Sequence, residues 1–215
     1  MTDHRSDGKR DIRTGPSPLL AWTLAWGVTG AALYISGVFN SPRTGPLWVA
    51  LAGGAISWSI AGAFTFPAGT RDPSNRRNIA GFLVWALAYL VSFALVGLLT
   101  NVLPDSMGQL IIMLIGWSIG PGLGAFAGTR LLADRPSLGR SGLVAAAWTL
   151  GFFAGGYVGL VGGYIGPELA KILIGSLIGM PAALTLGFGS GCAIGGLVAS
   201  VIAVTLTRLI TRFLH

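Results

Sequence analysis

The chain alternates between long apolar runs and short polar segments. Five runs have about the 20 apolar residues that a helix needs to cross the hydrocarbon core of a bilayer. They cover residues 18–39, 46–66, 79–100, 108–132 and 142–164. The pattern predicts an all-α integral membrane protein, because a backbone in lipid has to satisfy its own hydrogen bonds within helices or closed barrels.

A further apolar region, residues 169–210, is 42 residues long, which is too long for one straight span at about 1.5 Å per residue. In one division, residues 167–179 form a short extra helix on the outer side, with Pro and Glu in its first turn, and Pro181 opens a sixth span. In the other, a turn near residues 187–191 separates a sixth span from a seventh. We favour six spans, because an internal repeat pairs the spans.

Three tryptophans carry that repeat. Trp22, Trp85 and Trp148 follow one another at intervals of 63 residues, and Trp22 and Trp148 lie in identical Ala-Trp-Thr-Leu tetrapeptides. Self-similarity at a fixed period indicates a repeat architecture. The sequence therefore predicts three parallel two-helix repeats, with pseudo-threefold symmetry about an axis along the membrane normal. Their limits are about 14–76, 77–139 and 140–211.

The composition agrees with a chain surrounded by lipid. Apolar residues make up 53% of the chain, charged residues make up 10%, and the mean hydropathy is +0.73. Water-soluble domains carry about 25% charged residues. The net charge of +7 does not indicate a nucleic-acid partner, because all 14 Lys and Arg residues lie at the ends of the apolar runs or between them. The expected partners are membrane lipids and other membrane proteins.

The positions of the basic residues predict the orientation. With six spans and a cytoplasmic N-terminus, 12 of the 14 Lys and Arg residues lie on the cytoplasmic side, and only Arg43 and Lys171 lie outside. An excess of Lys and Arg marks cytoplasmic segments; seven spans would give a weaker split. We expect a polar cytoplasmic tail (1–16), a single domain (17–211) and a cytoplasmic end (212–215) in a plasma (inner) membrane.

Glycine is the second organising feature, with 34 residues, many of them four apart. Residues four apart form one ridge of a helix, and a ridge of glycines lets a neighbouring backbone come close, which drives helix association in lipid. We interpret the ridges as helix-packing surfaces; the alternative is that they line a central path. The ridge glycines are Gly116, Gly120, Gly124, Gly128, Gly151, Gly155, Gly159, Gly163, Gly187, Gly191 and Gly195.

Two prolines are candidate kinks. Pro121 lies inside the run 108–132, where it removes a backbone donor, and Pro181 lies inside the last apolar region. Broken helices form binding sites in many transporters. Proline is also tolerated in ordinary spans, where neighbouring groups satisfy the freed carbonyl, and we favour this second interpretation.

The aromatic residues could serve packing or binding. For Trp22, Trp85 and Trp148 we favour anchoring or symmetric packing over a ring of three indoles that faces a ligand. Other aromatic side chains that converge on the axis would indicate a binding role. The candidates for this are Trp58, Trp117 and Tyr157.

Residues that carry most chemistry are missing from the predicted spans. None of them contains Asp, Glu, Lys, Arg or His at its interior, and the single cysteine is Cys192. Intramembrane charges serve proton relays, voltage sensors and ion-coupled pumps. The sequence also offers no cluster with metal-ligand spacing and no nucleophile with a base. We therefore expect no enzyme, no metal and no cofactor.

Six spans in three pairs resemble the layout of mitochondrial carriers. Their Pro-x-[Asp/Glu]-x-x-[Lys/Arg] motif is absent, because the segment 167–171 has the wrong spacing, and the sequence indicates no family. Two hypotheses follow. The one we favour from the sequence is a structural or accessory membrane component that binds other membrane proteins or lipids. The alternative is a passive channel or transporter for a small neutral or apolar solute.

Overall fold

The computed structural model describes residues 17–38, 46–65, 75–102, 108–132 and 137–213, and these residues form six helices and no strand. Five of the helices are long and apolar enough to cross a membrane; α4 is the one outside this group. The chain is therefore a helical, membrane-like protein. The helices are α1 (Pro18–Ile35), α2 (Leu47–Thr65), α3 (Asn75–Val102), α4 (Gly108–Leu132), α5 (Leu138–Ile178) and α6 (Met180–Phe213).

The first four helices lie where the apolar runs predict them. The bounds of α4 coincide with the predicted run, and α1 begins with the expected signals: Pro18 is its first residue, and the Ser17 side chain accepts a hydrogen bond from the backbone N–H of Leu20 at 3.3 Å. Pro121 lies within α4, which continues through it.

The last apolar region differs from the prediction. Residues 167–178 continue α5 through Pro167 and do not form a separate helix. The whole of α5 has 41 residues, or about 61 Å of helix, twice the roughly 30 Å of a hydrocarbon core. Gly179, with φ +85°, connects α5 directly to α6. The alternative prediction of a turn near residues 187–191 is wrong, because α6 is one helix throughout. The prediction of a kink at Pro181 is also wrong, because Pro181 is the second residue of α6.

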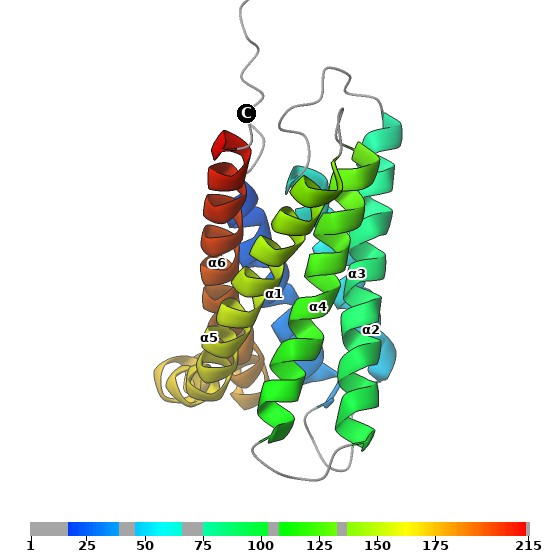
Figure 1. Ribbon diagram of the computed structural model, residues 1–215. Helices are drawn as coiled ribbons and strands as arrows, with labels where there is room; N and C mark the ends of the chain where they lie inside the picture. Colours follow the sequence, from blue (N-terminus) through cyan, green and yellow to red (C-terminus); the bar gives the residue numbers. More distant parts are fainter. Residues whose placement is uncertain (1–16, 39–45, 66–74, 103–107, 133–136, 214–215) are drawn as a thin grey trace, which may run out of the picture.

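The six helices form a closed ring. Each helix packs mainly against its neighbours in the chain, and α6 returns to pack against α1 (Figure 1). The centre of the ring is filled by aromatic side chains from α1, α2, α3 and α5. The ring thus brings residues from distant parts of the sequence to one axis.

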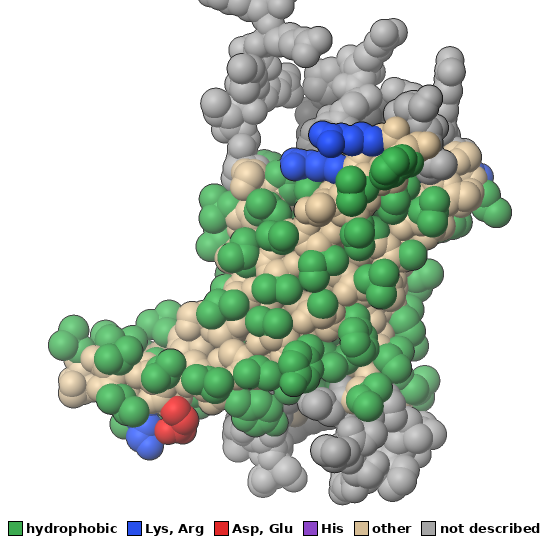
Figure 2. All heavy atoms as spheres, turned by 60° about the vertical axis from the view of Figure 1, so that its left-hand side comes forward, with side chains coloured by type: hydrophobic (Ala, Val, Ile, Leu, Met, Phe, Trp, Pro, Cys, Tyr) green, Lys and Arg blue, Asp and Glu red, His purple; other side chains and the backbone are tan. Residues whose placement is uncertain are grey.

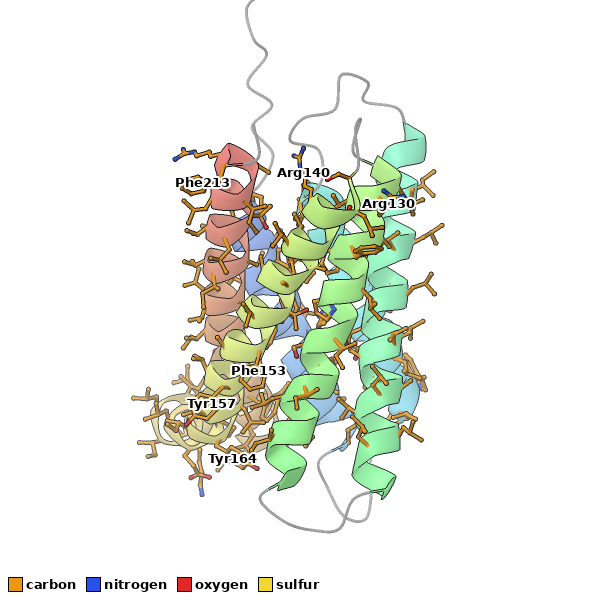
Figure 3. All side chains as sticks on the ribbon, viewed as in Figure 1. Arg130, Arg140, Phe153, Tyr157, Tyr164 and Phe213 are labelled. Carbon is orange, nitrogen blue, oxygen red and sulfur yellow. The ribbon has the colours of Figure 1, made fainter. Side chains whose placement is uncertain are left out.

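Two ends of the bundle differ in charge. Arg130 and Arg140 lie at the same end as Phe213, the last residue of α6, and Tyr164 lies toward the other end (Figure 3). We call the end with Arg130, Arg140 and the basic last turns of α6 the basic end.

An apolar arm leaves the bundle sideways at the end opposite the basic end. It consists of the last turns of α5 and the first turns of α6, from Pro167 to Leu186 (Figure 2). Most of its large apolar side chains are exposed: Ile172 by 77% and Leu177 by 84%. Glu168 and Lys171 form an exposed ion pair on the arm, with Lys171 Nζ and Glu168 Oε2 4.0 Å apart.

The backbones of α5 and α6 lie in contact through glycines. A Cβ placed on Gly151 would be 2.6 Å from the carbonyl oxygen of Ala199, and one on Gly162 would be 2.6 Å from that of Gly191. Such distances leave no room for a side chain. Residues Gly155 and Gly166 of α5 face α6 in the same way, so this contact surface needs glycine on α5.

Candidate functional site

Trp22, Trp85 and Trp148 meet at the axis of the ring. Their ring centroids are 4.7 Å apart for Trp22 and Trp85, 5.4 Å for Trp22 and Trp148, and 5.0 Å for Trp85 and Trp148. Phe152 packs edge-on against Trp22 at 5.2 Å. All four side chains are almost fully buried. We call these four residues the tryptophan cluster.

The surrounding helices hold this cluster in place. The indole Nε1 of Trp22 donates a hydrogen bond to Thr65 Oγ1 at 2.8 Å, which fixes the ring against the end of α2. Gly62 lies directly against the ring of Trp85, where a Cβ would collide with the indole. The cluster therefore depends on a glycine of α2 for space as well as on its own ring contacts.

A second aromatic layer lies beside the cluster. Trp58 is 1% exposed and contacts Tyr89 at 5.2 Å and Trp117 at 6.0 Å between centroids. Trp58 also contacts Phe152, a member of the tryptophan cluster, at 5.2 Å. The hydroxyl of Tyr89 donates to the backbone carbonyl of Ala50 at 2.7 Å. Aromatic side chains from five helices, α1 to α5, are thus joined into one continuous core.

A cavity of about 490 Å³ begins at this second layer. Its inner part is lined by Trp26, Trp58 and Trp117, and its outer part reaches Tyr164 and Pro167. Because Tyr164 lies toward the end opposite the basic end (Figure 3), the cavity extends from mid-bundle toward that end. Five helices, all except α3, contribute lining residues.

Glycines of α5 form part of the cavity wall. Gly156, Gly159 and Gly163 all line it. A Cβ on Gly159 would lie 3.2 Å from the ring of Trp26, and one on Gly163 would lie 3.1 Å from that of Phe188. Two of the predicted helix-packing glycines therefore also face the open volume.

The lining is apolar and carries no charged side chain among the residues that the structure describes. Its hydroxyl groups come from Thr29, Tyr34 and Tyr164, and Cys192 adds a thiol. Thr29 Oγ1 and Ser57 Oγ are already hydrogen-bonded to each other at 3.0 Å. Pockets of this kind bind drug-sized apolar ligands, which a few polar groups orient.

The other predicted site residues have different positions. Gly116, Gly120 and Gly124 of α4 face α3, against Val96, Ser92 and Ala88. Gly187, Gly191 and Gly195 of α6 face α5. Pro121 is fully buried in α4. Tyr157, a candidate with Trp58 and Trp117 for a side chain near the axis, does not lie there: it is 55% exposed on the outer surface of α5 (Figure 3).

Sequence reasoning missed a second glycine face on α6. Gly189 and Gly196 face α1: a Cβ on Gly189 would lie 2.9 Å from the carbonyl of Gly27, and one on Gly196 would lie 2.6 Å from the Cβ of Trp26. The signal was present, because these two glycines are seven residues apart. Spacing by four alone does not find them.

In the described part of the chain, no group of three or more His, Cys, Asp and Glu side chains could hold a metal ion. No protein-family model, no curated protein and no solved structure matches this chain.

Proposed function

We propose that this chain is a membrane protein that binds a small neutral, largely apolar solute in the aromatic cavity, as a passive transporter. The observation that carries the proposal is the cavity itself: about 490 Å³ of space next to Trp26, Trp58 and Trp117 near the axis of the ring. A bundle built only for packing would fill this space with side chains, because protein interiors are close-packed. No reaction is part of the proposal.

The chemistry of the lining supports a neutral solute. The described lining holds aromatic rings, glycines and aliphatic side chains, without a charged partner for an ion. An unpaired ion in such surroundings costs several kcal/mol or more. An uncharged solute keeps the contact with the aromatic walls and avoids this cost.

The closed side of the cavity supports transport rather than an open channel. The tryptophan cluster lies between the second aromatic layer and the basic end. In it, the side chains of Trp22, Trp85 and Trp148 are each 2% exposed or less. A solute in the cavity therefore reaches one end of the bundle and meets a packed aromatic barrier toward the other. Alternating access requires a state of this kind, with the site accessible from one side only.

Recurring contacts support the three-repeat arrangement that belongs to this proposal. Thr29 of α1 bonds Ser57 of α2, and Ser92 of α3 lies against Gly120 of α4. Ser92 follows Thr29 by 63 residues, and Gly120 follows Ser57 by the same interval. Gly155 of α5 follows Ser92 by 63 residues and lies against Gly195 and Ala199 of α6. We propose six spans in three repeats, the third longer than the other two.

The basic end supports a cytoplasmic orientation for both termini. Arg130 and Arg140 lie there, and α6 carries Arg212 in its last turn. Lys and Arg concentrate on the cytoplasmic side of membrane proteins. We propose that the protein resides in a plasma (inner) membrane and that the cavity faces away from the cytoplasm.

Solute binding tests the proposal directly. Purified protein in nanodiscs is incubated with tritiated tetralin, an uncharged bicyclic hydrocarbon, and binding is read by scintillation proximity against empty nanodiscs. We expect saturable binding of one molecule per chain. Leu160→Trp, which fills the cavity, should abolish it. Val161→Trp is the matched control, because Val161 is 40% exposed and Leu160 lines the cavity. Folded wild-type protein without saturable binding contradicts the proposal.

Cys192 tests the orientation. It lines the cavity and is the only cysteine of the chain. A small membrane-impermeant thiol reagent should modify it when added on the non-cytoplasmic side of oriented vesicles, and bound tetralin should slow the modification. Modification only from the cytoplasmic side would show that the cavity opens to the other compartment.

A second candidate function rests on the apolar arm. Leu173 and Leu177 of the arm are 74% and 84% exposed, which fits an accessory component that binds lipids or other membrane proteins. Native mass spectrometry after gentle extraction tests this role. A subunit or lipid that co-purifies at fixed stoichiometry and that Leu173→Lys removes would favour it, whereas a chain that retains neither would contradict the accessory role.

A further inference from the structure

The apolar arm begins after α5 is already long enough to cross a bilayer. About 20 residues suffice for a span, and α5 passes that number before Pro167. The remaining turns of α5 leave the bundle sideways, and Gly179 returns the chain to α6 (Figure 2). The arm is thus surplus to the span, and it runs across the axis of the bundle rather than along it.

The α5 half of the arm has two opposite faces. Leu169, Leu173 and Leu177 follow one another at intervals of four and form one stripe. They are 53%, 74% and 84% exposed. Glu168 and Lys171, the only charged residues of the arm, lie about half a turn away from this stripe at about 100° per residue. The segment is therefore amphipathic, as are helices that lie at membrane interfaces.

The charged face of the arm points away from the rest of the bundle. In Figure 2, the acidic and the basic side chain of the arm lie on the side that faces away from the basic end. Both side chains are exposed, Lys171 by 51% and Glu168 by 69%, so the bundle covers neither of them. A charge is costly in hydrocarbon and stable among headgroups and water. The leucine stripe, on the opposite face, is directed toward the level of the bilayer.

We propose that the arm lies along the surface of the leaflet opposite the basic end, with its leucine stripe among the lipid acyl chains and with Glu168 and Lys171 among the headgroups. The partner of the arm is the lipid of that leaflet. This inference rests on the membrane location proposed above and names the partner of the arm in the second candidate function. It does not require that the cavity transports a solute.

The distribution of apolar side chains favours lipid over a protein partner. Exposed apolar side chains are not confined to the leucine stripe. Ile172, at the margin between the two faces, is 77% exposed, and Met180 and Leu186 of α6 are 44% and 56% exposed. A protein partner covers one face of a helix, whereas acyl chains cover every apolar surface below the headgroups. Lipid therefore removes all of this apolar surface from water, without a complementary shape.

The position of the arm also sets the depth of the cavity mouth. Pro167, the first residue of the arm, lines the cavity, and so does Tyr164, about one turn before it. Tyr164 is 76% exposed. With the arm along the membrane surface, the outer part of the cavity lies at the level of the headgroups, where the proposed solute would enter.

Site-directed spin labelling tests the depth of each face of the arm. In the Cys192→Ala background, which has no native cysteine, Leu173→Cys, Leu177→Cys and Lys171→Cys each carry one nitroxide in nanodiscs. Oxygen concentrates in hydrocarbon and a nickel chelate stays in water, so the ratio of their collision rates with the nitroxide reports depth. This ratio should be several-fold higher at positions 173 and 177 than at position 171.

Other patterns overturn the inference. A high rate with the nickel chelate on both faces would place the arm in water. Low rates with both reagents at positions 173 and 177 would show that a second copy or another protein covers the stripe. Equal, high ratios on both faces would show that the arm is submerged in hydrocarbon.

A matched control on the same helix gives the value for a lipid-facing position. Leu150 is 60% exposed in the part of α5 that precedes the arm, so Leu150→Cys should give a high ratio of oxygen to nickel collisions. A ratio typical of water at this position would contradict the membrane location on which the inference rests.

Tetralin binding to wild-type nanodiscs separates this inference from the proposed function. Saturable binding together with any of the contrary accessibility patterns on the arm would overturn only the placement of the arm. The expected accessibilities without saturable binding would contradict the transport proposal and support the placement of the arm in the leaflet.

Discussion

One face of α5 uses glycine to bring a backbone close, and the neighbouring face uses it to leave space. At Gly155, a Cβ would collide with the carbonyl of Gly195 and lie 2.5 Å from the Cβ of Ala199 on α6. At Gly156, the next residue, the nearest atom is a flexible methyl of Leu114 at 3.1 Å, and the residue lines the cavity. A high glycine content therefore does not by itself distinguish a helix–helix contact surface from the lining of a cavity.

We expect the largest loss of stability from a substitution at Gly155, on the face of α5 that contacts α6. Gly155→Leu should cost about 3 kcal/mol or more, because both backbones would have to separate. Gly156→Leu places the same side chain beside the cavity and should cost less than about 1 kcal/mol, while it weakens tetralin binding. Thermal melting followed by size-exclusion chromatography measures both. Equal stability of the two variants would show that the two faces do not differ.

An intermediate effect concerns the barrier that closes the cavity. Thr65→Val removes the acceptor of Trp22 Nε1 and leaves a buried donor unpaired, which should cost about 1–3 kcal/mol. Thr65→Ser keeps the oxygen and should stay close to the wild type. The free energy of unfolding in mixed micelles measures the difference. A Val variant as stable as the Ser variant would mean that the hydrogen bond does not hold the tryptophan cluster.

We expect the smallest change in stability at an exposed glycine of α5, which packs neither against α6 nor against the cavity. Gly142 is exposed, and a Cβ there would have nothing within 4 Å. Gly142→Ala should therefore stabilise the helix by about 0.5–1 kcal/mol, because alanine loses less backbone entropy than glycine. The same melting assay measures the gain. A loss of stability would indicate that a contact outside the described residues covers this position.

Hydrophobic length predicted most of the helices, and tertiary packing determined the rest. Helices α1 to α4 follow from windows of about 20 apolar residues, and α4 matches at both ends. The end of α5 could not be found this way. Pro167 suits the start of a helix as well as a position inside one in lipid. In the structure α5 continues past it, and Gly166 lies against Gly187 of α6, a contact between distant residues that the local sequence does not show.

The candidate site was predicted only in part for a similar reason. The period of 63 residues selected Trp22, Trp85 and Trp148, which contact one another in the structure, although it did not decide between packing and binding. Trp58 and Trp117 line the cavity, whereas Tyr157 lies outside. All three lie inside predicted spans, and the residues beside them do not show which way each side chain points. The direction of each side chain depends on helix rotation, which neighbours around the ring set.

The return of α6 to α1 has a consequence for the order of assembly. Their interface joins Gly27 and Gly30 to Gly189 and Cys192, so it joins the helix that is translated first of the six to the one that is translated last. Chains emerge from the ribosome at roughly 5–20 residues per second. Until α6 emerges, the glycine face of α1 stays uncovered and the cavity lacks one wall. Solute binding would thus report a ring that α6 has closed, and a product stopped before α6 would present the uncovered face of α1 to the membrane's proteases.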